Sequence, residues 1–394
     1  MIKIEDKRDC CGCSACQQIC PHHCITMEED DCGFHYPKVD LSVCVNCHLC
    51  ENVCPVLNRY PEKEEPMQCY LGKSLDEDNR SKSSSGGIFM ELASEVIREG
   101  GVVFGVRFDE NWQAIYDYAG TIEGVVPFRG SKYIQADPNN AYTLAKEFLT
   151  QGRRVFFTGT PCVIAGLNHF LRKKYDNLLT LDFVCHSIPS PKIWKLYLKN
   201  VTEKYGAETI KDVSFRDKSN GWFMYSTRVV LEKENGVLVK IIENKEENIF
   251  MRGFFGDLYS KPSCSKCPAR KYTSNSDITV ADAWHIDKYH PERNDEKGMS
   301  HILINTDKGK SYFQRIIPKT DVSVIEYSEV EPYGVHATLL YSCKPNRLQK
   351  RFYKRISKGE PMTKVTESIL YQNECIDKCL KPIKKIVKLC MGRK

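Results

Sequence analysis

Cys10-Cys11-Gly12-Cys13-Ser14-Ala15-Cys16-Gln17-Gln18-Ile19-Cys20-Pro21 is repeated, in its cysteines and its proline, as Cys44-Val45-Asn46-Cys47-His48-Leu49-Cys50-Glu51-Asn52-Val53-Cys54-Pro55. Each matched cysteine recurs 34 residues later, so the segment is an internal duplication. Cys10 fits both the spacing and the offset. The neighbouring Cys11 is therefore interpreted as a spare thiol.

The shared spacing is typical of bacterial ferredoxins that hold two [4Fe–4S] clusters. Three thiolates three residues apart reach three irons of one cluster, and the fourth cysteine, ahead of a proline, binds the other cluster. The pattern predicts two crossed ligand sets, Cys10, Cys13, Cys16 and Cys54 for one cluster and Cys44, Cys47, Cys50 and Cys20 for the other. Zinc is the alternative, but it favours pairs of C-x-x-C over triplets.

Cysteine and charge are both unevenly distributed along the 394 residues, a length that suggests two or three domains. Twelve of the 20 cysteines lie in residues 1–69. Because neither an export signal nor a membrane-spanning apolar run is present, metal chemistry is favoured over disulfides, and a cytoplasmic location is expected. The net charge is +6, but residues 1–69 carry −6 and residues 343–394 carry +11, which does not indicate a nucleic-acid-binding protein.

The region after the proline-bounded linker 61–66 alternates between predicted strands and helices. Strands are expected at 102–106, 155–157 and 178–184, and helices at 88–97, 141–150, 161–171 and 192–205. This alternation predicts an α/β domain with a partly parallel sheet. Within the cysteine-rich segment, residues 25–27 and 34–36 flank an acidic turn and predict a hairpin.

Two small-residue loops and four further cysteines are candidate ligand sites. The loops Ser85-Gly86-Gly87 and Thr158-Gly159-Thr160 precede predicted helices, whose N-termini attract phosphate, although ordinary turns and caps are the alternative. Neither a strand followed by Gly-x-Gly-x-x-Gly nor a Walker A loop is present. Four further thiols follow predicted strands or lie in a loop, namely Cys162, Cys185, Cys264 and Cys267. The alternatives for them are ligation of a metal, zinc included, and packing in the core.

An ordered series of motifs resembles one known family. After the cysteine repeat come Ser84-Ser85-Gly86-Gly87, Gly130-Ser131-Lys132-Tyr133, Thr158-Gly159-Thr160-Pro161-Cys162, Cys185-His186-Ser187-Ile188-Pro189-Ser190-Pro191, Phe215-Arg216-Asp217-Lys218, Gly221-Trp222, Cys264-x-x-Cys267 and Asp277-Ile278-Thr279-Val280. In this order they resemble the family of coenzyme F420 hydrogenase/dehydrogenase beta subunits over about residues 5–330. Val163, Ser187 and residues 281–285 depart from the family pattern around the substrate pocket.

The resemblance implies an iron–sulfur flavoprotein that contains FAD. It makes Ser85, Gly86, Gly87, Lys132, Tyr133, Thr158, Gly159 and Thr160 candidates to line the FAD site. It also strengthens the hypothesis of a third [4Fe–4S] cluster on Cys162, Cys185, Cys264 and Cys267. The expected domains are a ferredoxin-like domain over 1–60, a larger α/β flavin-binding domain with a mixed sheet over 67–330, and a basic tail over 331–394.

The function that follows is electron transfer between [4Fe–4S] clusters and FAD, with hydride chemistry at the flavin. Its substrate is coenzyme F420 or another organic molecule, and its partners are a redox partner such as ferredoxin or F420 and a partner subunit. The alternatives are a ferredoxin-fed reductase unrelated to F420 and a non-catalytic electron-transfer adaptor. The catalytic residues are not identified, with His186 and Lys132 as weak candidates. Apolar residues between the lysines of 381–390 suggest weak membrane-surface contact or a solvated helix.

Overall fold

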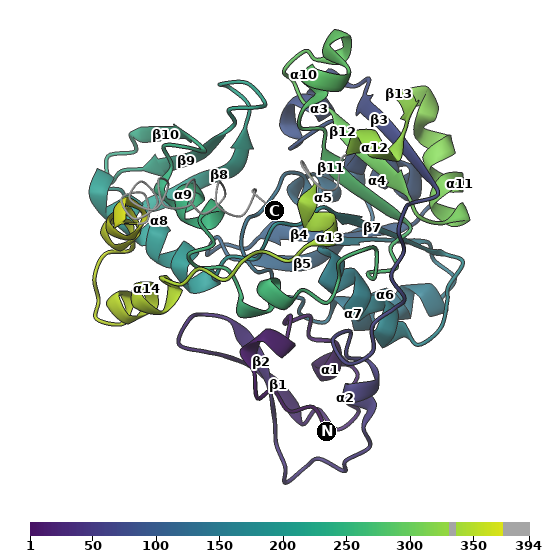
Figure 1. The fold of residues 1–394 in the computed structure, drawn as a ribbon, viewed down its shortest axis with the longest axis horizontal. Coiled ribbons are helices and arrows are strands. Elements are labelled where there is room, and N and C mark those ends of the chain that lie inside the picture. The colour runs from purple at the N-terminus through teal and green to yellow at the C-terminus, as the bar shows by residue number, and fades with distance from the viewer. Residues whose placement is uncertain (331–335, 373–394) are drawn as a thin grey trace, which may run out of the picture.

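The computed structural model describes residues 1–330 and 336–372, which form a small head over residues 1–60 and a larger core (Figure 1). In the head, β1 (Ile25–Glu29) pairs antiparallel with β2 (His35–Val39), which confirms the predicted hairpin. The short helices α1 (Ala15–Gln18) and α2 (Leu49–Asn52) occupy equivalent places in the two cysteine repeats. The two repeats therefore fold alike around the hairpin.

The core is built on an eight-stranded sheet with strand order β13-β3-β12-β11-β7-β6-β4-β5. Its inner strands β4, β6, β7 and β11 run parallel, and the remaining neighbours pair antiparallel. The mixed α/β class predicted from the sequence is confirmed. The strands are β3 (Gln68–Ser74), β4 (Val102–Phe108), β5 (Ala114–Ala119), β6 (Val155–Gly159), β7 (Leu178–Phe183), β11 (Ile278–Asp282), β12 (Ser300–Ile304) and β13 (Thr320–Ile325).

Helices cover both faces of this sheet because its central strands are apolar on both sides. On β6, Val155 and Phe157 belong to one buried cluster and Phe156 to another, as expected for a strand whose side chains alternate between faces. The first cluster packs under α6 (Ala141–Thr150) and α7 (Pro161–Leu171), and the second under α4 (Ile88–Arg98) and α11 (Asp307–Ile316). The first three of these helices match the predicted ranges to within about one residue.

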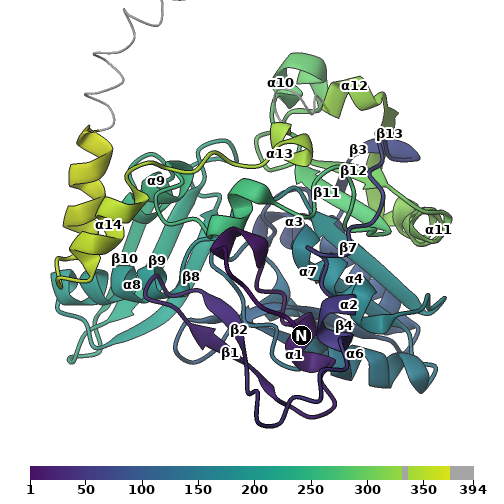
Figure 2. The ribbon, with the colours of Figure 1, turned by 60° about the horizontal axis from the view of Figure 1, so that its bottom comes forward.

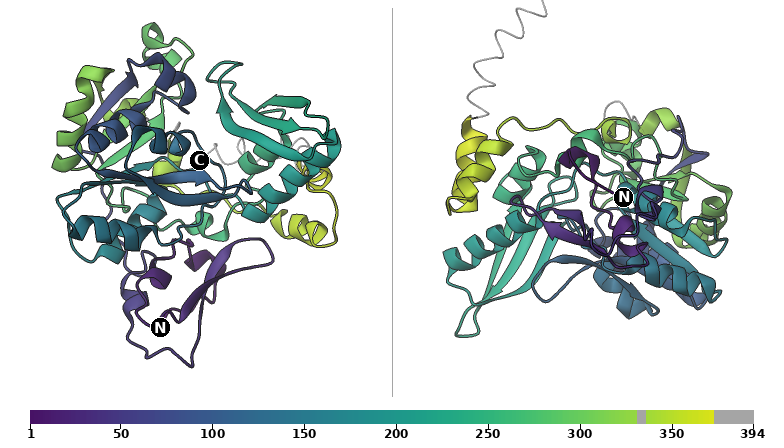
Figure 3. Two further views of the ribbon diagram at one scale, coloured as in Figure 1. Left: turned by 180° about the vertical axis from the view of Figure 1, so that it is seen from behind. Right: turned by 90° about the horizontal axis from the view of Figure 1, so that it is seen from below.

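A second, three-stranded antiparallel sheet lies beside the main one (Figure 3). It has the order β10-β9-β8, made of β8 (Thr209–Asp217), β9 (Ser226–Glu232) and β10 (Leu238–Asn244). Its apolar face packs against α8 (Pro191–Tyr205), α9 (Ile249–Phe255) and α14 (Gln349–Ile356) through a buried cluster that includes Trp194, Phe250 and Phe352. Of these elements only α8 was predicted from the sequence.

The region expected to be a basic tail therefore includes packed structure. Besides α14 it contains α13 (Ala337–Leu340), whereas the basic pattern at 381–390 lies outside the described residues. Residues 362–372 are also helical, and four further helices are short, namely α3 (Glu77–Lys82), α5 (Ile122–Val125), α10 (Ile286–Tyr289) and α12 (Tyr327–Val330). Across 1–330 and 336–372, every helix is too short or too polar to cross a lipid bilayer.

The head sits on the core over α6 and α7 (Figure 2). Gln18 of the head accepts hydrogen bonds from the backbone N–H groups of Tyr142 (2.9 Å) and Thr143 (3.2 Å), which satisfies donors at the start of α6. Gly166 of α7 permits close approach, since a Cβ at that position would lie 2.9 Å from the Cys13 sulfur. These contacts bring the first cysteine repeat against the core.

Candidate metal centres and an adjoining ligand site

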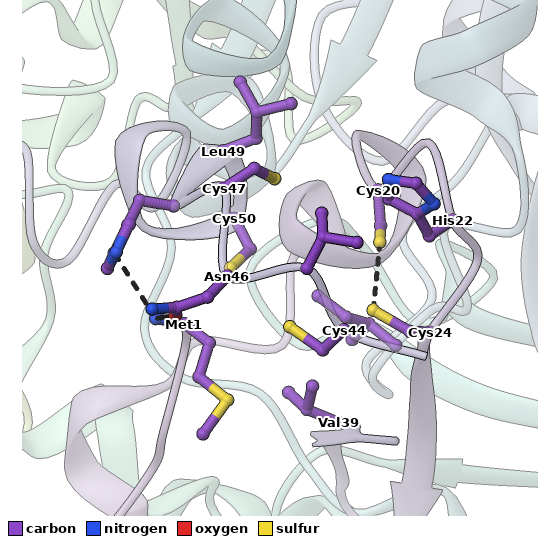
Figure 4. A pocket seen from close by; sticks show the side chains of 13 residues that line it. Met1, Cys20, His22, Cys24, Val39, Cys44, Asn46, Cys47, Leu49 and Cys50 are labelled. Atoms are coloured by element: carbon purple, nitrogen blue, oxygen red, sulfur yellow. Dashed lines mark hydrogen bonds between the residues drawn. The ribbon is translucent and has the colours of Figure 1, made fainter. Parts of the chain in front are cut away.

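Two cavities in the head are lined by cysteines from both repeats. One is lined by Cys10, Cys13 and Cys16 together with Cys54, and Cys11 also faces it. The other is lined by Cys44, Cys47, Cys50 and Cys20, together with Cys24 (Figure 4). The fold thus places the fourth cysteine of each repeat with the triplet of the other, which supports the crossed ligand sets. Several thiol donors that line one cavity are the chemistry that an iron–sulfur cluster needs.

Extra sulfur atoms and backbone donors complete these two cavities. The Cys24 sulfur lies 3.3 Å from that of Cys20, so Cys24 adds a fifth thiol to the outer site. The backbone N–H of Ile2 donates to the Cys50 sulfur at 3.2 Å. Hydrogen bonds of this kind stabilise a thiolate ligand and raise cluster potential. Cys47 is exposed, so the outer cavity lies close to solvent.

A third group of thiols lies at the carboxyl edge of the main sheet. Cys162 begins α7 directly after β6, Cys185 follows β7, and Cys264 and Cys267 lie in and after a short 3-10 helix (Pro262–Lys266). All four belong to the same buried cluster. Burial raises the pKa of Cys185 to about 12. Uncharged thiols are therefore favoured until a metal replaces their protons.

Cys343 belongs to this third group, which the sequence analysis did not predict. It packs against the same buried cluster, and burial raises its pKa to about 12. Its segment is fixed by two contacts, since Ser342 accepts a hydrogen bond from the Cys267 N–H (3.0 Å) and Arg270 bonds backbone carbonyls of both Cys185 and Thr338. The third group thus has five thiols.

The inner head cavity and the third group adjoin each other. The Cys11 thiol contacts the thiols of both Cys13 and Cys162. This contact raises the pKa of Cys162 well above its usual range, and burial adds to the effect. Cys11, which the spacing leaves without a ligand role, therefore lies between two candidate clusters.

The arrangement of the thiols bears on the zinc alternative. Among residues 1–330 and 336–372, no three His, Cys, Asp or Glu side chains converge as the ligands of one metal ion would. A single zinc ion draws its ligands to one centre. A cubane separates them, because each thiolate binds a different iron. The triplet spacing of each repeat, in which three thiolates reach three different irons, fits clusters better than zinc.

Two of the loops predicted to bind FAD lie together. The Ser84 hydroxyl accepts a hydrogen bond from the Ser131 N–H (2.8 Å) and lies 2.9 Å from the Ser131 hydroxyl. Gly86 is fixed by close packing, since a Cβ there would lie 2.5 Å from the Gly72 carbonyl oxygen. The Ser84–Gly87 and Gly130–Tyr133 loops thus form one wall of a candidate ligand site.

Arg216 of β8 joins this wall to the main sheet. Its guanidinium donates to the Ser84 carbonyl (2.8 Å), the Tyr133 hydroxyl (3.1 Å) and both carboxylate oxygens of Asp282 (2.8 Å each). Its Nε is buried with no hydrogen-bond partner among the described residues. An unpaired buried donor at this position fits an acceptor atom of a bound ligand. Sequence reasoning included Arg216 in a motif but gave it no role.

The third predicted FAD loop lies elsewhere on the sheet edge. Thr158 donates to the Phe104 carbonyl (3.0 Å), and the Thr160 hydroxyl lies 3.3 Å from the Cys162 sulfur. In the described part of the chain, no hydrogen bond joins Thr158–Thr160 to the Ser84–Gly87 loop. Thr160 therefore belongs to the surroundings of the third thiol group.

The two weak catalytic candidates have different surroundings. The Lys132 ammonium donates to the carbonyls of Pro127, Arg129 and Gly130 within its own loop, and burial lowers its pKa to about 7. It therefore fixes the loop in the structure as it stands. His186 is partly exposed, and its Nε2 lies 3.0 Å from an Asp257 carboxylate oxygen. This Nε2 nevertheless has no hydrogen-bond partner among the described residues.

Three family models match the chain. Residues 9–58 match a 4Fe-4S dicluster domain. Residues 69–142 and 152–330 match the N-terminal and C-terminal models of the coenzyme F420 hydrogenase/dehydrogenase beta subunit. The matched residues include both cysteine repeats, the loops around Ser84 and Ser131, and the first four cysteines of the third group.

Known proteins that are similar to this chain include two relatives and one solved structure. A subunit of the F(420)H(2) dehydrogenase of Methanosarcina mazei is 25% identical over 332 residues, which are 79% of this chain and 84% of that protein. A 7Fe ferredoxin of Hydrogenibacillus schlegelii is 37% identical over 65 residues, 16% of this chain and 77% of that protein. A chain of the F420-reducing [NiFe] hydrogenase complex from Methanosarcina barkeri is 16% identical, with a TM-score of 0.45, over 76% of this chain and 97% of that chain.

Proposed function

The chain belongs to the family of coenzyme F420 hydrogenase/dehydrogenase beta subunits, and we propose that it is an iron–sulfur flavoprotein oxidoreductase. In this proposal its cysteines hold [4Fe–4S] clusters, its core binds FAD, and the substrate is coenzyme F420 or another organic molecule. When bound, clusters supply one-electron transfer and a flavin links it to two-electron hydride chemistry. The chain's own residues bind these groups, bring them close together and shield them from water.

The observation that carries the proposal is the contact between the Cys11 and Cys162 thiols. It makes the inner head cavity and the third thiol group neighbours, although the two cysteines are 151 residues apart in the sequence. Redox centres exchange electrons when they lie close together. A head used only for structure would not need its ligand loop against the third group.

The residues proposed to bind FAD are those of the Ser84–Gly87 and Gly130–Tyr133 loops, together with Arg216. The unpaired Arg216 Nε supplies a donor for an anionic or carbonyl oxygen, and Asp282 holds the guanidinium in place. Thr158–Thr160 and His186 lie at the carboxyl edge of the same sheet, where ligands of open α/β sheets bind. In this proposal His186 is available to move a proton, because its Nε2 lies 3.0 Å from an Asp257 carboxylate oxygen and has no hydrogen-bond partner among the described residues.

The proposed partners follow from the Methanosarcina mazei relative, which is named as a subunit of an F(420)H(2) dehydrogenase. By analogy this chain works with a partner subunit, and its redox partner is F420 or ferredoxin. The outer cavity with its exposed Cys47 is the natural point of electron exchange with such a partner, because that cavity is closest to solvent.

Anaerobic purification tests the proposal. The protein should contain about eight to twelve iron atoms per chain, show cluster absorbance and release FAD on denaturation. Colourless protein that contains zinc would contradict it. Iron without flavin would favour the electron-transfer adaptor. Flavin bleaching by reduced F420, but not by reduced ferredoxin, would favour the F420-linked enzyme over the ferredoxin-fed reductase.

A further inference from the structure

Lys261 places a buried ammonium group at the boundary between the head and the core. The residue is only 1% exposed, and its Nζ donates one hydrogen bond, to the His35 carbonyl at 3.3 Å. Over the ranges 1–330 and 336–372, no carboxylate forms an ion pair with it. Burial lowers the pKa of Lys261, whereas the nearby thiols of Cys10, Cys11 and Cys264 and, to a smaller extent, the Asp30 carboxylate oppose that shift. A buried cation without a negative partner is strongly disfavoured, so its presence calls for a source of negative charge.

The two ends of Lys261 contact different thiol groups. Its ammonium lies against the ligand loop of the inner head cavity, since a Cβ on Gly12 would be 3.3 Å from Nζ. Its backbone carbonyl accepts a hydrogen bond from the N–H of Cys264 (2.9 Å), a member of the third thiol group. The residue therefore lies between the inner cavity and the third group, away from the outer cavity.

Aromatic rings complete the surroundings of the ammonium. The Nζ lies 4.0 Å from the centre of the Tyr36 ring and 4.8 Å from that of Phe34. Such rings accept a cation but do not neutralise it. The Tyr36 hydroxyl is itself buried with no partner among the described residues. The Lys261 ammonium and the Tyr36 hydroxyl are thus both suited to face an acceptor that carries negative charge.

Lys7 offers a matched comparison on the same ring. Its Nζ lies 3.9 Å from the centre of the Tyr36 ring. Unlike Lys261, the Lys7 side chain is 50% exposed and forms an ion pair with Asp30 (3.4 Å). Solvent and an ion pair with Asp30 already screen the charge of Lys7, whereas the buried Lys261 feels Asp30 only at longer range and forms no ion pair with it.

Building on the cluster ligands of the proposed function, we infer that Lys261 is the shared counter-cation of two clusters, one on Cys10, Cys13, Cys16 and Cys54 and one in the third thiol group. A [4Fe–4S] core with four thiolates carries net negative charge, and reduction adds one more. A fixed cation in a water-poor site stabilises the reduced form. Lys261 therefore raises the reduction potentials of these two clusters and leaves that of the outer cluster nearly unchanged.

Redox titrations of the holoprotein, followed by electron paramagnetic resonance, test this inference. Lys261→Met keeps most of the side-chain volume and removes the charge. We expect the one-electron reduction constants of the two clusters beside Lys261 to fall at least tenfold, which lowers their potentials by about 59 mV. The potential of the outer cluster should stay unchanged. Lys261→Arg should retain the wild-type potentials, and Lys7→Met should shift them much less.

The outcomes separate this inference from the proposed function. The role of Lys261 would be overturned if the cluster potentials shifted equally in Lys261→Met and Lys7→Met. It would also be overturned if they shifted equally in Lys261→Met and Lys261→Arg. Either result would leave the proposed function intact. Loss of iron in Lys261→Met but not in Lys261→Arg would support a need for the charge, whereas loss in both would reject it. Wild-type protein without cluster signals would contradict the proposed function itself.

Discussion

Arg216 and Asp282 form a two-point ion pair that joins the three-stranded sheet to the eight-stranded one. Both hydrogen bonds are 2.8 Å long, and the Arg216 side chain is 3% exposed. Burial alone would raise the pKa of Asp282, but the guanidinium outweighs burial and the net pKa lies below its ordinary value. The pair ties the two sheets together beside the loops proposed to bind FAD.

Removing one partner of this pair should destabilise the protein strongly. Arg216→Met leaves the Asp282 carboxylate buried and unpaired, so we expect the free energy of unfolding to fall by about 3 to 5 kcal/mol. Urea denaturation followed by circular dichroism measures this loss. The double variant Arg216→Met, Asp282→Asn should recover part of the loss, because it removes the stranded charge. A double variant as unstable as the sum of both single variants would contradict a direct coupling.

The crossed ligand sets make a prediction about cysteine variants. Cys54→Ser should remove or alter the cluster that the first repeat holds, because Cys54 lines the same cavity as Cys10, Cys13 and Cys16. Cys20→Ser should affect the other cluster instead. Iron content and the paramagnetic signals of the reduced protein measure both effects. Cys69→Ala on β3 is the control, since that buried thiol lines neither cavity.

The fifth thiol of the third group makes a separate prediction. If Cys162, Cys185, Cys264 and Cys267 hold the cluster, Cys343→Ser should keep its iron, whereas Cys267→Ser should lose it. The half-buried Cys343 side chain would then act through packing only. The opposite result, with iron lost in Cys343→Ser and kept in Cys267→Ser, would exchange the two ligands. Iron analysis of the two variants side by side distinguishes these cases.

The spacing of residues along the chain predicted the features that depend only on residues close together in the sequence. The cysteine repeat predicted the two thiol sets, and helix caps and apolar periodicity placed α6 and α7 at their observed bounds. The same reasoning could not find Cys343 or Lys261, because their roles depend on segments that meet only in the folded chain. The three-stranded sheet was also missed, since its strands lie between loops without a repeated motif.

The structure also shows why the role of a charged residue is hard to predict from its sequence motif alone. The resemblance makes Lys132 itself a candidate for the FAD site, yet its ammonium bonds three carbonyls of its own loop and the residues just before it. Arg216 had no assigned role and has the free buried donor. Charge and motif position are visible in a sequence, but whether a charged group is already satisfied by the chain's own carbonyls is not.

Asp182 on β7 makes a prediction about pH. It is 2% exposed and accepts a hydrogen bond from the Thr279 hydroxyl at 2.5 Å, and burial raises its pKa to about 6. Because the folded state then holds a proton that the unfolded state has already lost, its contribution to stability is full below the unfolded pKa. That contribution disappears as the pH rises through about 6.

Wild-type protein should therefore lose about 1 kcal/mol of stability between pH 5 and pH 8 through this group. Asp182→Asn, which stays uncharged, should remove that part of the pH dependence and be more stable than the wild type at pH 8. Urea denaturation at both pH values measures the difference. Asp176→Asn, at an exposed position, should leave the pH dependence unchanged. A wild-type slope that persists in Asp182→Asn would mean that another buried group titrates in this range.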